Sequence, residues 1–248
     1  MLAILGGTGL TNLADLKITH RQVIRTPYGE PSGALLLGNI AGHELMFMAR
    51  HGYGHTIPPH LVNYRANIWA LAAQKASHVV SVSAVGGIDP RLVPGTLVMP
   101  DQLIDYTYGR KHTFFDTTDQ RVAHMDFTEP FSPELRDICI NAASKSSIDV
   151  KSGGVYAVSQ GPRLDTAAEV RRYAYDGASM VGMTGMPEAA LARELGLQYV
   201  TLAVVSNYAA GCGDNLQRIE GKTVYAALER TMQRVRSFLE QVVICFHD

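Results

Sequence analysis

The sequence predicts a single α/β domain over residues 1–248, with a mixed, twisted sheet flanked by helices. Two observations carry this prediction: strand-like runs alternate with helical patterns almost to the end of the chain, and no repeat, low-complexity tract or Pro/Ser-rich linker divides it. With 46% hydrophobic and 18% charged residues, the 248-residue chain can bury a sizeable core. Disordered and fibrous proteins are therefore excluded.

Strands are predicted where short runs are rich in apolar or β-branched residues. The first run opens the chain without a basic segment and leads straight into Gly6, so it reads as a buried strand rather than a signal peptide. The predicted strands cover 1–5, 34–39, 44–49, 78–83, 96–100, 154–159, 178–182 and 198–205.

Helices are predicted where apolar residues recur every three to four positions. Ser132 and Pro133 supply an N-cap followed by proline at the first helical position, and Thr166 with Glu169 has capping-box spacing. Gly196 fits the position just after a helix end. The predicted helices cover 60–76, 132–146, 166–175, 187–195 and 222–243.

Charge and cysteine content limit the expected partners and compartment. Lys and Arg number 22 against 23 Asp and Glu, and no basic cluster would follow a phosphate backbone, so neither nucleic acid nor an anionic membrane is expected to bind. No stretch reaches the roughly 18 consecutive apolar residues that span a bilayer. Cys139, Cys212 and Cys245 are scattered and form no CxxC pair, as in a reduced cytosolic protein. We therefore expect a cytoplasmic location.

Three segments at predicted strand ends are suited to an anion. Thr8 lies among glycines whose backbone N–H groups are accessible, Arg50 and His51 pair a guanidinium with an imidazole, and Ser83 precedes Ala84 near two further glycines. Strand ends meet at one edge of an α/β sheet, which favours a shared site. Each segment alone is equally consistent with an ordinary turn.

A metal site and a nucleotide-cofactor site are both disfavoured at these segments. His51 and His55 have the spacing of a helical metal pair, but two glycines lie between them and no third ligand is evident nearby. The glycines around Thr8 lack both the Gly-Lys-Ser/Thr of a P-loop and the third glycine of the dinucleotide motif. We expect no metal and no cofactor.

Three further segments offer polar groups, each with a structural alternative. Asp165 precedes the capping box and serves equally well as a helix-start carboxylate. Thr184 lies between a buried strand and a helix, where the neighbouring Met183 is more often core filler. Asn207 follows another buried strand, where a turn-forming role is common.

In this order, the segments resemble the trimeric purine nucleoside phosphorylase and methylthioadenosine phosphorylase family. The resemblance runs from Gly6 to about Leu239. Its most specific parts are the ARHG…H segment at 49–55 with the following 62–70, the GPR segment at 161–163, Met183-Thr184 and Pro187-Glu188. It implies the nucleoside phosphorylase fold and metal-free cleavage of an N-glycosidic bond by inorganic phosphate, which is a co-substrate rather than a cofactor.

The resemblance also implies roles for individual residues. His51 is implied as a catalytic phosphate contact, and Met183 lies along the ribose. His124, in the pattern-free stretch 106–130, is implied to reach a neighbouring subunit's substrate, so we expect a homotrimer; a lone surface histidine is the alternative. The implied phosphate site consists of Thr8, Arg50, His51, Ser83, Ala84 and Thr184.

The base site departs from the methylthioadenosine enzymes. Asn207 and Ala209 stand where those enzymes carry aspartates, and Asn207 matches the 6-oxopurine enzymes. An amide can donate to O6 while its oxygen accepts from N7–H, whereas a carboxylate only accepts. Asp165 stands where the 6-oxopurine enzymes place a glutamate that accepts from N1–H. Asn207 and Asp165 are therefore the predicted catalytic groups on the purine.

Two more departures concern the base and the 5′ group. Leu164 replaces the usual stacking phenylalanine, so the base contact must be weaker or come from elsewhere, with Tyr208 as one candidate. Gly221, Val224 and Tyr225 occupy the region of a histidine that binds the 5′-OH, which implies an apolar 5′ pocket. A 6-oxopurine site with an apolar 5′ pocket predicts S-methyl-5′-thioinosine as the substrate.

Other functions stay open at this level. The enzymatic alternatives are a methylthioadenosine phosphorylase with relaxed base recognition and an inosine/guanosine phosphorylase. The alternative outside enzymes is a nucleoside- or phosphate-binding protein, which would need neither stabilisation of N7 nor a matched anion site. A Rossmann-type oxidoreductase is disfavoured by the missing third glycine.

Overall fold

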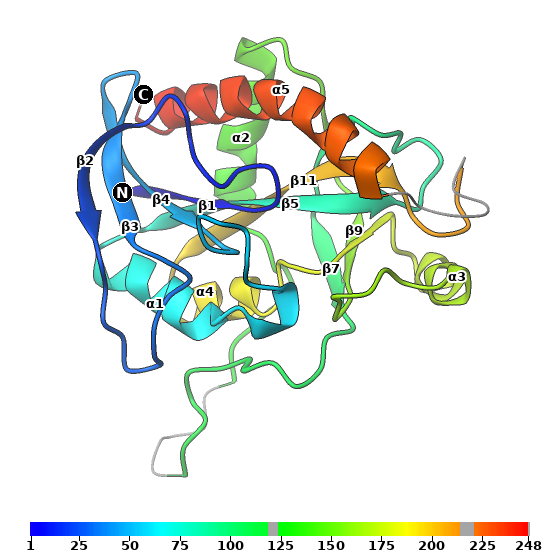
Figure 1. Cartoon of the computed structure of the whole chain (residues 1–248), viewed down its shortest axis with the longest axis horizontal. Coiled ribbons are helices and arrows are strands. Elements are labelled where there is room, and N and C mark those ends of the chain that lie inside the picture. Colours follow the sequence, from blue (N-terminus) through cyan, green and yellow to red (C-terminus); the bar gives the residue numbers. More distant parts are fainter. Residues whose placement is uncertain (119–123, 214–220, 248) are drawn as a thin grey trace.

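The computed structural model describes residues 1–118, 124–213 and 221–247, without the side chains of 221–228 and 230. Within these residues eleven strands form one mixed sheet, and helices cover both of its faces (Figure 1). The α/β fold with a mixed sheet is therefore confirmed. No helix of the described segments is both long and apolar enough to cross a membrane.

The long strand β5 (His78–Gly87) organises the sheet. β11 (Gln198–Tyr208) pairs in parallel along the whole of one edge of β5. On the other edge, the parallel pairing with β1 (Leu2–Gly6) ends at Ser81, and β10 (Met180–Gly182) pairs antiparallel only at the last two residues. The intervening segment 82–85 is open to other contacts, and it contains Ser83 and Ala84.

The remaining strands extend this sheet. β4 pairs in parallel with β1, β3 pairs antiparallel with β4, and β2 forms the edge. On the other side, β9 and β7 follow β10, while β6 and β8 continue from β11. Their bounds are β2 (Lys17–Gln22), β3 (Leu35–Ile40), β4 (His43–Ala49), β6 (Leu97–Met99), β7 (Gln102–Asp105), β8 (Val150–Ser152) and β9 (Val155–Val158).

Helices α2 and α5 contact each other on one face of the sheet, and α1 and α4 do so on the opposite face (Figure 1). Helix α3 lies apart, beside β9 and β7 (Figure 1). The bounds are α1 (Tyr64–Ala73), α2 (Pro133–Lys145), α3 (Ala167–Tyr175), α4 (Glu188–Glu194) and α5 (Gly221–His247). A 3₁₀ turn, η1, covers Pro59–Leu61.

Each predicted strand and helix is present, but several bounds differ. The predicted helix from residue 60 begins only at Tyr64, because the Asn63 side chain accepts from the Ala66 N–H and caps the helix there. The predicted strand ending at Ser83 continues to Gly87, since β11 supports it along its full length. Strands β2, β7 and β8 were not predicted; β2 is an exposed edge strand without a buried face.

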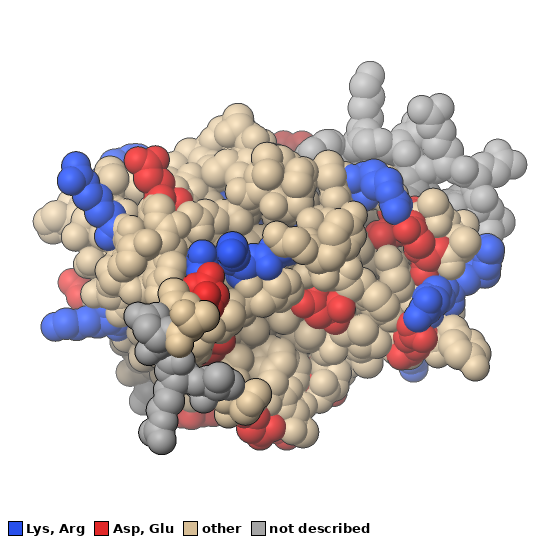
Figure 2. All heavy atoms as spheres, turned by 90° about the horizontal axis from the view of Figure 1, so that it is seen from below, with Lys and Arg blue, Asp and Glu red and all other residues tan. Residues whose placement is uncertain are grey.

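The described surface carries mixed charges. On the face shown in Figure 2, Lys and Arg are interspersed with Asp and Glu among the atoms that are not grey. Cys139, Cys212 and Cys245 are free thiols. In the part of the chain that the structure describes, no three His, Cys, Asp or Glu side chains are grouped to hold a metal ion.

Candidate active site

A cavity of about 590 Å³ lies at the carboxyl ends of β1 and β4 and beside the open segment of β5. This volume suits a small-molecule ligand. Most of the predicted site residues line it, although they come from distant parts of the chain. These are Thr8, Arg50, His51, Ala84, Leu164, Asp165, Met183, Thr184, Asn207 and Ala209.

Arg50 is fully buried, and it directly follows β4. Its backbone N–H donates to Gly6 at 2.9 Å and joins the ends of β4 and β1. Its Nε and Nη2 donate to the Glu188 carboxylate. Its Nη2 also donates to the Ser81 hydroxyl, and its Nη1 donates to the Val82 carbonyl at 2.9 Å. Four of the five guanidinium N–H groups are thus engaged.

The fifth guanidinium N–H, on Nη1, has no acceptor among the described residues. A side chain at Gly7 would place a Cβ 2.8 Å from this nitrogen and 2.3 Å from the Val82 carbonyl oxygen. Glycine at position 7 therefore keeps the space beside Nη1 clear. Arg50 lines the cavity, and a guanidinium with an unused N–H can donate a charge-assisted hydrogen bond to an anion.

Glu188 neutralises Arg50 inside the protein. It is fully buried at the start of α4, and its Oε2 also accepts hydrogen bonds from Tyr199 at 2.8 Å and Ser81 at 3.1 Å. Burial alone would lower the pKa of Arg50, but the Glu188 carboxylate raises it above its ordinary value. Breaking such a pair leaves an uncompensated buried charge. Glu188 therefore fixes the position of Arg50.

His51 is held as a neutral ring. Its Nδ1 lies 2.8 Å from the Ile57 carbonyl oxygen, which can only accept, so Nδ1 carries the hydrogen and Nε2 is an acceptor. Burial, followed by the charge of Arg50, lowers the pKa of His51 to about 4. Neutral Nε2 suits a protonated oxygen, such as a hydroxyl of hydrogenphosphate or ribose.

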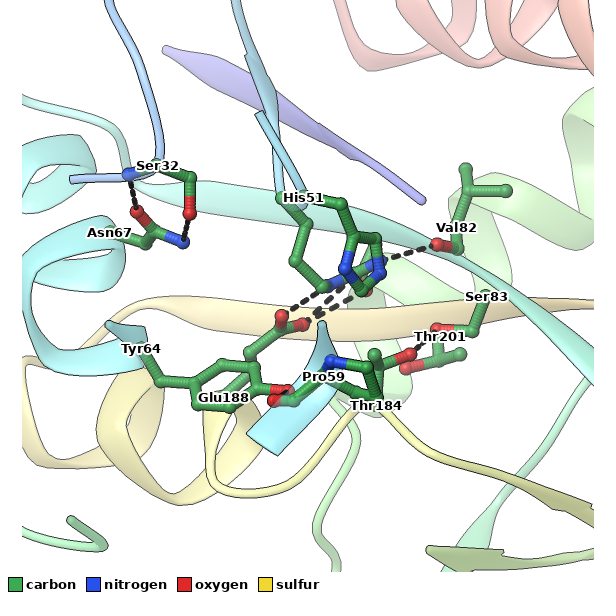
Figure 3. Close-up of polar contacts among 12 residues, drawn as sticks. Ser32, His51, Pro59, Tyr64, Asn67, Val82, Ser83, Thr184, Glu188 and Thr201 are labelled. Atoms are coloured by element: carbon green, nitrogen blue, oxygen red, sulfur yellow. Dashed lines mark hydrogen bonds and ion pairs between the residues drawn. The ribbon is translucent and has the colours of Figure 1, made fainter. Parts of the chain in front are cut away.

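Hydroxyl groups surround the same end of the cavity. The Ser83 and Thr184 hydroxyls are 3.0 Å apart and face each other (Figure 3). Thr184 lines the cavity and Ser83 does not, so Ser83 lies directly behind the cavity wall. The Thr8 hydroxyl lies 3.1 Å from Nε2 of His55. The His55 ring lies 5.0 Å from that of His51, in a turn and not in a helix. This end of the cavity is thus rich in donors.

Asp165 lies at the other end of the cavity, directly before the Thr166 cap of α3. Its Oδ2 accepts from Ser159 at 3.0 Å and its Oδ1 accepts from Tyr173 at 3.1 Å. Burial raises the pKa of Asp165, while these two hydrogen bonds lower it. Its lone pairs are only partly used, so the carboxylate can accept further hydrogen bonds.

The amide of Asn207, near the end of β11, has one defined orientation. One terminal atom lies 2.6 Å from the Tyr208 carbonyl oxygen and must be Nδ2, because a second acceptor would be repelled. The other atom, Oδ1, accepts from the Ser206 hydroxyl at 2.7 Å. The amide keeps one free N–H and one free lone pair for a ligand. It therefore offers a donor and an acceptor side by side.

Three other predicted residues differ in their surroundings. Leu164 lines the cavity but is 54% exposed. His124 is exposed and does not line the cavity of its own chain. The side chains of Val224 and Tyr225 lie outside the described residues, and for Gly221 only the backbone is described.

Several residues that organise the site had no predicted role. Arg110 lies in the stretch 106–130, where no secondary structure was predicted. It is buried and donates to the carbonyls of Met183, Met186 and Gln160. It thereby ties together the loops after β9 and β10. Tyr173 lies within the predicted helix 166–175, but no contact was predicted for it. No local motif marks either residue: the partners of Arg110 are distant in sequence, and Tyr173 follows Asp165 by eight positions, a spacing that belongs to no motif.

Comparison with known proteins supplies the family. The profile described as "Phosphorylase superfamily" matches residues 1–244. A protein of Xanthomonas campestris named "Probable S-methyl-5′-thioinosine phosphorylase" is 52% identical over 213 residues, which are 86% of this chain and 85% of the relative. A "6-oxopurine nucleoside phosphorylase" of Pyrococcus furiosus is 45% identical over 216 residues, covering 85% and 80% of the two chains.

A solved structure confirms the fold. Methylthioadenosine phosphorylase from Schistosoma mansoni in complex with adenine superposes with a TM-score of 0.95 at 32% sequence identity. The superposition covers 99% of this chain and 91% of that one. The architecture is therefore shared over essentially the whole length of the chain.

The buried ion pair leads to a prediction about stability. Glu188→Gln removes the charge that balances Arg50 and should lower the free energy of unfolding by about 3–5 kcal/mol. Thermal unfolding at matched protein concentration should show a melting temperature lower by roughly 10 °C. Tyr199→Phe is the control, because it removes only one hydrogen bond to the same carboxylate and should cost less. Equal melting temperatures for Glu188→Gln and the wild type would contradict this assignment.

Proposed function

Because the chain belongs to the phosphorylase superfamily, we propose that it cleaves S-methyl-5′-thioinosine with inorganic phosphate. The products are hypoxanthine and 5-methylthioribose 1-phosphate. The observation that carries this proposal is the base end of the cavity, where the oriented Asn207 amide and the Asp165 carboxylate complement a 6-oxopurine. The Xanthomonas campestris relative carries this activity in its name.

The base is read by matching donors and acceptors. The free N–H of Asn207 donates to O6 of the purine, and its oxygen accepts from N7–H. Asp165 accepts from N1–H. Adenine has an acceptor at N1 and an amino group at position 6, so both contacts become unfavourable for adenine nucleosides.

Phosphate binds at the opposite end of the cavity in this proposal. The free Nη1–H of Arg50 and the hydroxyls of Thr8, Ser83 and Thr184 donate to its oxygens, with Ala84 beside them. Neutral His51 accepts from the protonated oxygen of hydrogenphosphate. The site thus places the nucleophile and the leaving base on either side of the ribose, along which Met183 lies.

The reaction requires no protein nucleophile. A phosphate oxygen bonds to the ribosyl C1′ as the bond to N9 breaks, and the bonding electrons pass to the purine. The intervening state is oxocarbenium-like. The free N–H of Asn207 stabilises the negative charge that accumulates on the purine, N7 takes up a proton from solvent, and Asp165 positions the base through N1–H. Neither a metal nor a cofactor takes part in this scheme.

A 6-oxopurine nucleoside phosphorylase acting on inosine or guanosine is the second candidate. The Pyrococcus furiosus relative with this name supports it. The two candidates share the base site and differ at the 5′ position, where the inferred apolar pocket around Val224 favours a methylthio group. We propose a cytoplasmic location, which the three free thiols support.

The first prediction concerns the substrate. Methylthioinosine should have the highest kcat/KM among methylthioinosine, methylthioadenosine, inosine and guanosine, and hypoxanthine release should require phosphate. Chelators should leave the rate unchanged. Binding of the nucleoside without any release of base would show a binding protein, and faster cleavage of inosine would identify the second candidate.

The second prediction concerns the amide. Asn207→Asp should shift preference toward methylthioadenosine, because a carboxylate accepts from the 6-amino group and opposes O6. The loss on methylthioinosine should be about 5- to 150-fold in kcat/KM, corresponding to roughly 1–3 kcal/mol. The Tyr208 carbonyl oxygen lies 2.6 Å from Nδ2 of Asn207 in the wild type. In the variant a carboxylate oxygen takes the place of Nδ2, and the repulsion between the two oxygens should reduce activity on both substrates. An equal loss on both nucleosides would remove Asn207 from recognition of position 6.

The third prediction concerns assembly. We propose a homotrimer in which His124 reaches the 5′ end of a substrate bound to a neighbouring subunit, since it is exposed and away from its own cavity. Light scattering should give three times the 27.0 kDa chain mass. His124→Ala should raise KM for the nucleoside and leave KM for phosphate unchanged. A fully active monomer would exclude this arrangement.

A further inference from the structure

Tyr173 contacts Asp165 and, unlike Asp165, does not line the cavity. It is on α3, is only 7% exposed, and its hydroxyl donates to Oδ1 of Asp165 at 3.1 Å. Burial raises the pKa of the Tyr173 hydroxyl, so the phenol remains a donor throughout the neutral range. The Tyr106 ring packs against Tyr173 with centroids 4.6 Å apart and limits its movement.

The protonation state of Asp165 decides which base it can bind. An ionised carboxylate accepts from N1–H of a 6-oxopurine, whereas a protonated carboxyl group donates to the bare N1 of adenine. Burial favours the protonated form and thus the wrong base. The hydrogen bonds from Ser159 and Tyr173 oppose this effect.

We propose that Tyr173 is a specificity-determining positioning residue, whose hydroxyl keeps Asp165 an ionised acceptor for N1–H and thereby disfavours adenine nucleosides. This inference rests on the proposed function. It identifies a residue that selects the base without touching it.

The other charged groups near Asp165 largely compensate each other. Arg163, in the preceding loop, forms an ion pair with Glu169 of α3 at 2.7 Å. Glu169 raises the pKa of Asp165 and Arg163 lowers it. Tyr106, after β7, faces Tyr173 and donates to Asp176 at 2.6 Å rather than to Asp165. Tyr173 and Ser159 are therefore the two groups that directly hold the carboxylate.

The inference predicts a pH-dependent base preference. As the pH falls through the pKa of Asp165, the ratio of kcat/KM for methylthioinosine to that for methylthioadenosine should fall. Tyr173→Phe removes one hydrogen bond to the charged form, which should raise that pKa and move the midpoint of the ratio upward by about one pH unit. Below the midpoint, the ratio should be roughly ten-fold lower than in the wild type at the same pH.

The test measures this ratio from about pH 5 to 9 in saturating phosphate. Tyr106→Phe is the matched control, because it removes a hydroxyl from the same aromatic pair without touching Asp165, and its curve should superpose on that of the wild type. Asp165→Asn should make the ratio independent of pH. Tyr173→Met, which fills the buried space without a hydroxyl, replaces Tyr173→Phe if that variant does not fold.

Two failures are distinguishable. Absence of phosphorolysis of methylthioinosine by the wild-type enzyme would overturn the proposed function. An active wild type whose ratio curve is unchanged by Tyr173→Phe, or is shifted equally by Tyr106→Phe, would overturn the role of Tyr173 alone.

Discussion

The buried pair of Arg50 and Glu188 is the constraint on which the site depends. It links the end of β4 to the start of α4, and Arg50 also bonds to the open edge of β5 and to the end of β1. Because the pair is wholly enclosed, the guanidinium cannot turn toward solvent. Under the proposed function, the Arg50 N–H that phosphate meets is oriented during folding, so binding requires little reorganisation of this side chain.

A second buried arginine orders another part of the cavity wall. Arg110 gathers the carbonyls after β9 and β10, which sets the path of the segment carrying Met183 and Thr184. Arg50 holds a carboxylate and a backbone carbonyl inside the protein, and Arg110 holds several backbone carbonyls. A buried arginine can do this because its planar fork presents several fixed donors at once.

The sequence predicted the fold class and most elements because buried strands and capped helices have local signals. It missed β2, whose residues are all exposed, and β7 and β8, which are short and contain no fully buried residue, whereas the equally short β6 and β10 are buried apolar runs. Thr8, Arg50, His51 and Ser83 were predicted from anion-suited chemistry at strand ends, and the resemblance to a family then assigned the roles of the site residues. Tyr173 and Arg110 were not predicted, because Arg110 bonds to residues tens of positions away and the spacing of eight positions between Asp165 and Tyr173 matches no motif.

The two ends of the base site differ in how firmly their chemistry is fixed. At position 207 the backbone carbonyl of Tyr208 requires a donor, so an amide is favoured whatever ligand is bound. At position 165 the carboxylate can change protonation state, and its ionised form depends on two hydroxyl donors working against burial. Under the proposed function, selection against adenine rests on a backbone carbonyl at one end and on an adjustable protonation state at the other. A change of base preference within this fold is accordingly easier to reach through the surroundings of Asp165 than through Asn207.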